Sequence, residues 1–285
     1  ISYAKDSNDF DVIGTTFHRW VKSNTKSMGL KNAKDIYTFI CIEMPFYAEV
    51  FNVIREAERT MQEELYMINA QTTYGLAPSL TYPLYFAAIN ITDSKVEIKN
   101  KMKRIALTID SFVARRLLEG KTIAQASVRG FLQDFIFKVR GCSLEGLRKE
   151  SKSFLDRYAN QIVTVVADAT YTNKLIRYIH YRVNLYLARL QSEDILLTYN
   201  DCRGCRLYGI DGSYPVVVKG TNTIPVFDMY LSHPKNTMPN IYKKLVGSHT
   251  IDDFILPTEL KHILQSNENT SYDIFNWILH DIWKD

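Results

Sequence analysis

The sequence predicts a mainly α fold, in which a multi-helix, bundle-like domain at residues 1–200 precedes a small C-terminal segment of mixed α/β or irregular structure at residues 201–285. Apolar side chains recur every three or four positions through the first two hundred residues, which is the helical period. The chain has only 12 Gly and 8 Pro, fewer than a turn-rich sandwich or a glycine-loop nucleotide fold needs. After Tyr199 this texture changes, since four glycines fall within residues 204–220.

Taken in order, the periodic stretches predict successive helices. The first spans residues 35–44 and ends at Pro45, and a longer one spans residues 46–69. A third begins at a cap on Asp93 or Ser94 and ends at Gly120, where a glycine commonly follows a helix. Three further helices are expected at residues 127–139, 144–155 and 171–190. The C-terminal segment predicts a hairpin turning at residues 211–212 and a terminal helix at residues 272–283.

The helix expected from residue 95 to residue 119 has two distinct faces. An apolar stripe runs from Ile98 to Leu117 and indicates the core side. A second stripe follows the same spacing, and we expect it to be exposed and to carry positive charge and hydroxyl groups. It consists of Lys101, Arg104, Thr108, Ser111 and Arg115. Arg116 is rotated by about 100° from its neighbour, so we expect an internal ion pair with Asp110 or Glu119.

Charge is unevenly distributed along the chain. The net charge is +4, but residues 99–149 hold twelve basic and four acidic residues, and residues 250–285 hold seven acidic and two basic ones. The helix expected at residues 171–190 carries Lys174, Arg177, Arg182 and Arg189 without an acidic residue. This asymmetry favours one basic face that attracts an anion, with a solvated surface neutralised by its neighbours as the alternative.

The apolar runs, the N-terminal charges and the cysteines of the sequence indicate the cellular compartment. The longest nearly apolar run, residues 82–91, is about half of what a membrane-spanning helix needs. Charged residues near the start leave no visible signal peptide, and two of the four cysteines are isolated in helical stretches, which favours reduced thiols and a cytoplasmic protein without membrane contact. The chain begins without Met, so we expect a fragment of a longer protein.

Catalytic signatures are missing from the sequence. We find no phosphate-binding Gly-x-x-x-x-Gly-Lys loop, no Gly-x-Ser-x-Gly turn and no His-Glu-x-x-His helix, and we therefore expect no catalytic residue and no cofactor. Cys202 and Cys205 have the spacing of half a zinc knuckle. The alternative interpretation is a plain turn that holds two cysteines. His233, Asn240 and His249 form a His, Asn, His series like that of the ββα-metal nucleases. The alternative interpretation is that they are loop residues without a catalytic role.

Five stretches in order resemble one family, the GmrSD-type modification-dependent restriction endonucleases. The most specific is Asp-Phe-Asp-Val-Ile-Gly-Thr-Thr-Phe-His-Arg-Trp at residues 9–20. The others are Tyr-Pro-Leu-Tyr-Phe-Ala at residues 82–87, Asp-Ser-Phe-Val-Ala-Arg-Arg at 110–116, Val-Arg-Gly-Cys-Ser-Leu-Glu-Gly-Leu at 139–147 and Asn-Lys-Leu-Ile-Arg-Tyr-Ile at 173–179. Together they span roughly residues 9–200.

The resemblance implies the helical middle of a larger protein. Such proteins begin with a ParB-like domain that carries an Asp-Gly-Gln-Gln-Arg run, and many end in a His-Asn-His-type nuclease domain that is marked by an Ile-Glu-His-Ile motif. Neither run occurs here, so the catalytic residues of the family transfer to no position in this chain. His18 lies in the family's helix entry, where we expect a structural role with a hydrogen bond beside Trp20.

Our leading functional expectation is a non-catalytic helical part of a bacterial restriction or anti-phage defence protein, which contacts DNA and organises neighbouring domains, including the family's N-terminal domain. The alternative is a protein–protein interaction or dimerisation scaffold, with a homodimer as one form. A third is an autonomous metal-dependent nuclease. Long cationic side chains on a rigid surface would contact phosphates without reading sequence. The candidates are Lys101, Arg104, Arg115, Lys174, Arg177 and Arg182.

Overall fold

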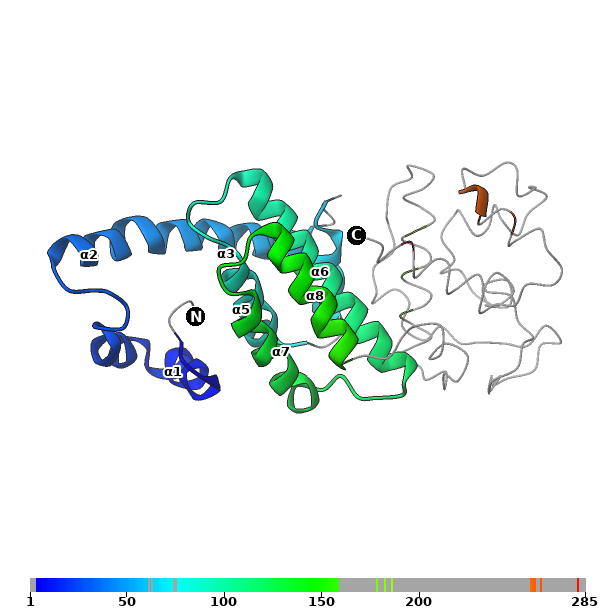
Figure 1. Cartoon of the computed structure of the whole chain (residues 1–285), viewed down its shortest axis with the longest axis horizontal. Helices are drawn as coiled ribbons and strands as arrows, with labels where there is room; N and C mark the ends of the chain where they lie inside the picture. The colour runs from blue at the N-terminus through cyan, green and yellow to red at the C-terminus, as the bar shows by residue number, and fades with distance from the viewer. Residues whose placement is uncertain are drawn as a thin grey trace. The chain divides into compact units, whose positions relative to one another are not determined.

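The computed structural model describes residues 4–158 except 61, 63, 74 and 75, together with residues 178, 182, 186, 257–259, 262 and 281 (Figure 1). The described residues are predominantly helical and contain no strand, which confirms the mainly α prediction. The chain forms two compact units, one of Ile1–Ile109 and Ala124–Leu155, the other of Asp110–Ile123 and Asp156–Asp285. The predicted boundary near residue 200, the hairpin and most of the helices at residues 171–190 and 272–283 lie outside the described residues.

The first helix, α1 (Ser7–Asn24), is kinked at Thr16, whose φ of −138° and ψ of 49° leave the helical region. The second half is anchored by Trp20, which is buried and whose Nε1–H donates to Asp9 Oδ1 at 2.9 Å. Two hydrogen bonds, from the Lys5 backbone first and then from Trp20, lower the pKa of the Asp9 carboxyl. Asp9 therefore joins the two halves of the kinked helix.

The next helical stretch is unusually long and irregular. It runs without a break through α2 (Ala33–Thr38), the π-helical turn η1 (Phe39–Glu43) and α3 (Met44–Arg59). Asn32 caps its start by accepting from the Lys34 and Asp35 backbone N–H groups. The prediction that Pro45 ends this helix is wrong, because the Met44 N–H already reaches back five residues to Phe39, and the π turn accommodates a proline that has no N–H to donate. We call residues 33–59 the arm.

The single helix predicted for residues 46–69 is also wrong. The arm ends at Thr60, whose backbone is extended and whose N–H and Oγ1–H both donate to the Glu56 carbonyl. A separate helix, α4 (Tyr66–Thr73), packs against α3. The uninterrupted apolar spacing across residues 57–68 conceals this turn, because Leu65 and Ile68 are buried in either arrangement.

The next two helices supply much of the buried core, and the second of them continues from the first unit into the other at Asp110. The first, α5 (Pro78–Ala88), tolerates Pro83 in its interior, and seven of its eleven residues are buried. The second, α6 (Lys95–Leu118), starts at the expected Ser94, which forms a reciprocal pair of hydrogen bonds with Glu97. The expected Gly120 follows its last turn with a φ of +68°.

The last two described helices, α7 (Gln125–Val139) and α8 (Leu144–Tyr158), complete the bundle much as expected. Helix α7 packs along α5, and the rings of Phe135 and Phe154 stack at 4.4 Å between α7 and α8. Gly141 separates these helices with a φ of +66°, and its N–H donates to the Ala87 carbonyl. Fully buried core side chains come from five helices, α3 and α5 to α8, and include Ile54, Leu84, Ile105, Leu132 and Leu147.

Two glycines of the first unit should respond oppositely to alanine. We expect Gly141→Ala to lower the free energy of unfolding by about 1–2 kcal/mol, because a Cβ is strained at positive φ. Gly130→Ala should raise it by about 0.5–1 kcal/mol, because that residue lies inside α7 with open space around it. Urea denaturation followed by circular dichroism measures both, and equal effects would contradict the assigned backbone conformations.

Candidate functional site

The polar stripe of α6 does not face solvent as expected. Lys101, Thr108 and Ser111 are buried, and Arg104 and Arg115 are half-buried. The exposed basic stripe predicted from the spacing is therefore wrong at its centre. The helix is enclosed on its polar side as well as its apolar side, which a hydrophobic stripe on one face does not reveal.

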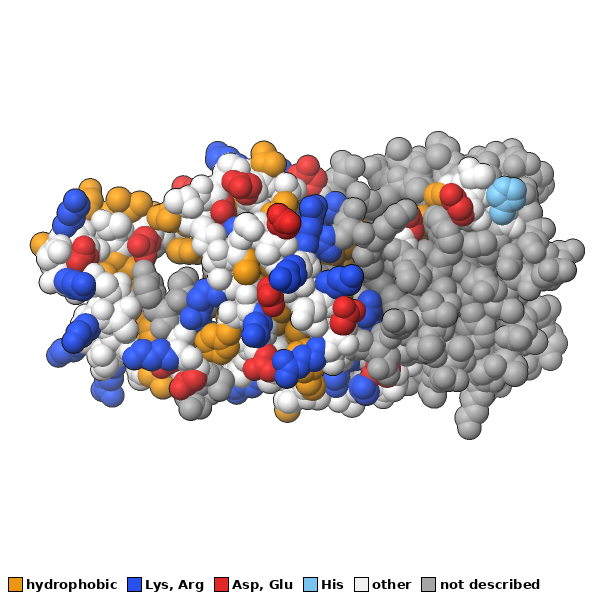
Figure 2. Space-filling model, viewed as in Figure 1, with side chains coloured by type: hydrophobic (Ala, Val, Ile, Leu, Met, Phe, Trp, Pro, Cys, Tyr) orange, Lys and Arg blue, Asp and Glu red, His pale blue; other side chains and the backbone are white. Residues whose placement is uncertain are grey.

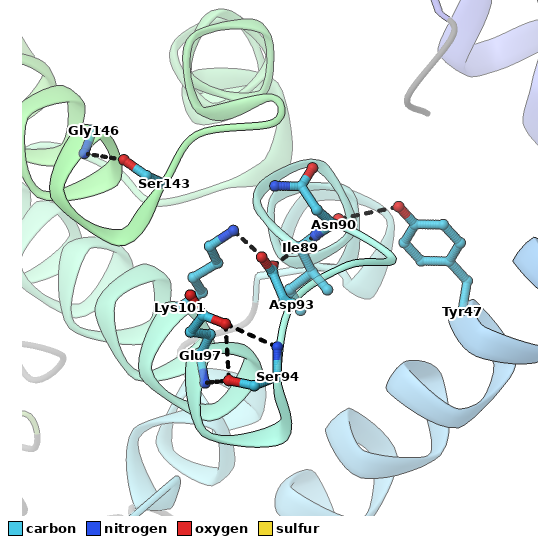
Figure 3. Close-up of polar contacts among 9 residues, drawn as sticks. All are labelled: Tyr47, Ile89, Asn90, Asp93, Ser94, Glu97, Lys101, Ser143 and Gly146. Carbon is cyan, nitrogen blue, oxygen red and sulfur yellow. Dashed lines mark hydrogen bonds and ion pairs between the residues drawn. The ribbon is translucent and has the colours of Figure 1, made fainter.

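Lys101 is held inside the first unit by an ion pair. Its Nζ donates to Asp93 Oδ2 at 2.6 Å, and the two side chains are only 2% and 10% exposed. The same carboxylate oxygen accepts from the Asn90 N–H at 2.8 Å, so the charge of Asp93 is doubly compensated (Figure 3). The stem of Lys101 thus ties α6 to the turn that precedes it.

Asp110 forms a second buried pair, within the other unit. Tyr178 donates its hydroxyl hydrogen to Asp110 Oδ2 at 3.1 Å, and Arg182 Nη2 lies 3.2 Å from the same oxygen. All three side chains are buried, and burial together with the Asp110 charge raises the pKa of Tyr178. Arg182 therefore serves as an internal counter-ion, whereas Lys174 and Arg177 lie outside the described residues.

Arg116 has the internal role that its rotation predicts: the Glu119 charge acts on it, and its guanidinium also binds backbone. Its Nε and Nη2 both donate to the Thr122 carbonyl, at 3.1 and 2.8 Å, and its guanidinium lies 5.6 Å from the centre of the Phe112 ring. Burial lowers the pKa of Arg116, while the Glu119 charge acts in the opposite direction. The guanidinium thus closes the loop after α6 by binding backbone.

The first unit contains an apolar groove of about 720 Å³. Tyr47 crosses one end, where its hydroxyl donates to the Ile89 carbonyl at 3.0 Å (Figure 3). Arg140 lies at the groove with its guanidinium over the Phe137 ring, and burial lowers its pKa. Most of the lining is aromatic or aliphatic, including Phe17, Trp20, Phe39, Tyr47, Phe51 and Phe86.

The groove continues onto an exposed apolar surface of the arm. No side chain of α2 or η1 is buried. Three of the apolar side chains of this part of the arm and Met44 at the start of α3 are 45–62% exposed, and Phe51 further along is 41% exposed. We call these five residues the arm face: Ile36, Tyr37, Ile40, Met44 and Phe51. Figure 2 shows hydrophobic side chains on the surface at this end of the first unit.

A basic surface adjoins the arm face. Residues 12–34 contain five cationic side chains and no acidic one. All five are exposed, at the end of α1, in the following turn and at the start of α2: Arg19, Lys22, Lys26, Lys31 and Lys34. His18 is exposed as well, and Asp9 rather than His18 hydrogen-bonds Trp20, so the role expected for His18 is wrong.

Comparison with protein-family models, curated proteins and solved structures finds no match. The resemblance to GmrSD-type proteins thus stays a prediction. Among the described residues, no cluster of His, Cys, Asp and Glu could hold a metal ion, and no helix is long and apolar enough to cross a membrane. Cys202, Cys205, His233, Asn240 and His249 lie outside that part of the chain.

The functional surface that sequence reasoning missed is the arm face. Its signal was present, because residues 36–44 are apolar at nearly every position and a helix that is apolar all round must be covered. Periodicity alone predicts the helix at residues 35–44 and does not indicate which of its faces is exposed. The basic run at residues 12–34 is smaller than the excess at residues 99–149, but its five cations are exposed, whereas part of the larger excess is internal.

Two lysines of α6 offer a direct test of the buried ion pair. We expect Lys101→Met to lower the free energy of unfolding by about 3 kcal/mol, because it leaves the Asp93 carboxylate largely buried without its cation. Lys99→Met, two residues away, removes an exposed pair with Glu64 and should cost less than about 1 kcal/mol. Equal effects in chemical denaturation would show that Lys101 faces solvent.

Proposed function

We propose that the helical domain is a non-catalytic assembly module that offers the arm face to another protein surface. The observation that carries this proposal is the arm itself: a helix with an exposed apolar face, continuous with an apolar groove. Contiguous apolar patches of this kind on folded proteins mark interaction sites. Covering each half-exposed side chain of the arm face contributes about 1 kcal/mol, so the surface can support association.

The backbone of the arm suits this role. Its C-terminal half is fixed by Val50, Ile54 and Ala57, which are buried against the bundle. Tyr47 adds a hydrogen bond to Ile89 and edge-on ring contacts with Phe46 and Phe86. A surface whose base is held by packing loses little conformational entropy when it binds a partner.

Cys41 provides a probe of whether the arm is covered in the cell. This cysteine is exposed in the middle of the arm, whereas Cys142 is half-buried beside α8. We expect maleimide labelling of Cys41 in cells that make the full-length protein at native level to be about tenfold slower than in the diluted purified protein, because the partner excludes the reagent.

Site-resolved mass spectrometry measures the labelling, with Cys142 as the internal reference. Cys142 should change little between the two conditions. If Cys41 reacts equally fast in cells and after purification, the arm is bare in the cell and the assembly function is rejected.

A second candidate is DNA contact by a part of a restriction-type defence protein, as the resemblance implies. The basic surface of residues 12–34 supports it, since five exposed cations on two helices and their connecting turn can contact phosphates. This places the contact on α1 and α2 rather than on α6. The exposed Phe17 beside them adds an aromatic ring of the kind on which bases stack.

The DNA candidate is tested by replacing Arg19, Lys22 and Lys26 with Gln. We expect weaker binding to all duplexes alike and a salt slope smaller by about two to three contacts, because each phosphate contact releases counter-ions. The matched control replaces Lys138, Lys149 and Lys152, which are also exposed. Gel-shift titration measures both. Equal losses in the two variants would show an effect of net charge alone.

A further inference from the structure

We propose that the partner of the arm face is a second copy of this chain, bound with the two arms antiparallel across a two-fold axis near Met44. This inference rests on the proposed assembly function and names its partner. It comes from the order of side chains along the arm, its charge distribution and the amount of apolar surface left uncovered.

The arm face has the order of a helix-pairing seam. Ile36, Ile40 and Met44 follow one another in steps of four, and a step of seven leads to Phe51. The two steps of four cross the π turn at residues 39–43, where one turn takes more than four residues, so the side chains stay on one face. Beyond the π turn, Met44, Tyr47 and Phe51 repeat at the three–four spacing that fills a seam between helices.

This seam reads nearly the same in both directions from Met44. Antiparallel pairing about that residue places Phe51 of one copy opposite Ile36 and Tyr37 of the other, and Tyr47 opposite Ile40. Large apolar side chains then meet large apolar side chains along the whole contact. A two-fold interface must be self-complementary in this way, because one patch serves as both partners.

Charge selects the antiparallel direction. Residues 12–34 carry a net charge of +5, and residues 35–58 carry five acidic residues and one basic residue, a net charge of −4. Antiparallel arms bring the positive part of each copy beside the negative part of the other. Parallel arms would bring the positive parts of the two copies together and the negative parts together, and such like charges repel one another within a Debye length of about 8 Å. The acidic residues of the arm also make it a poor surface for DNA.

The uncovered area is sufficient for association of two copies. The five side chains of the arm face are 41–62% exposed, which corresponds to roughly 500 Å² of surface on each copy. The pair would bury about 1,000 Å² or more, near the lower limit of specific interfaces. The adjoining groove widens the contact. We therefore expect a dimer of moderate affinity that dissociates on dilution.

The decisive experiment introduces one cysteine at the proposed axis. In a Cys41→Ser background, Met44→Cys places the same residue of both copies side by side. A short bis-maleimide should link position 44 to position 44 at least about tenfold faster than it links Val96→Cys, which is exposed on α6 outside the arm face. Peptide mapping assigns the linked positions and separates them from the other cysteines.

Sedimentation of the full chain supplies an independent readout. The parent should form dimers at micromolar concentration, and Ile40→Glu should raise the dimer Kd by about a hundredfold, because it would bury one unpaired carboxylate at each of two symmetry-related contacts. Ile40 is half-exposed in the single chain, so the circular dichroism spectrum should keep its helical signal, and the thermal midpoint should match that of the parent diluted below its dimer Kd. Val96→Glu is the matched control and should leave the dimer intact.

Each result decides between distinct conclusions. A chain that stays monomeric, or links position 96 as fast as position 44, overturns the second-copy proposal. If Cys41 is nevertheless protected in cells, the assembly function stands and another protein covers the arm. If the parent dimerises but Ile40→Glu dimerises equally well, the interface lies elsewhere and the proposal is likewise overturned.

Discussion

Helix α6 is enclosed on nearly every side, and this enclosure constrains the rest of the structure. From Met102 to Leu118 its apolar residues are buried, and so are a lysine, an aspartate, a threonine and a serine on its other faces. Each buried polar group needs a partner, because an unsatisfied one costs more than a hydrogen bond returns. Asp93 must therefore lie beside Lys101, and Tyr178 and Arg182 must lie beside Asp110. Gln71 follows the same logic, since it donates to the Ala106 carbonyl and accepts from Tyr85.

Because buried polar groups need partners, several basic residues of the chain serve inside the fold and do not form a charged surface. Positive side chains on a periodic helix suggest an anion-binding surface, yet Lys101 and Arg116 of α6, together with Arg182, neutralise internal carboxylates or bind backbone. Their net effect is cohesion within each unit. The cations left on the surface of the N-terminal helices adjoin an acidic arm, so the surface proposed to contact DNA and the surface proposed to pair with a second copy lie side by side.

Sequence periodicity predicted the helical class, the Ser94 cap and the glycine end of α6, because these depend on local spacing and on hydrogen bonds three residues away. It failed at Pro45, where a π turn supplies an alternative route for the backbone, and at Thr60, where a turn interrupts an unbroken apolar pattern. It also failed at Lys101. Whether a lysine faces water or a carboxylate depends on what packs over it, and Asp93 is eight residues away on the preceding turn.

Because of the π turn, the arm face depends on the number of residues in the arm as well as on which apolar side chains it carries. A helix that loses one residue between Phe39 and Glu43 returns to the ordinary α period, and everything before the deletion rotates by about 100°. Ile36 and Ile40 would then leave the line of Met44 and Phe51, although no apolar side chain had been replaced. The extra residue of the π turn thus sets the rotation of the part before it relative to α3, so that the exposed apolar side chains of both parts lie on one face of the arm.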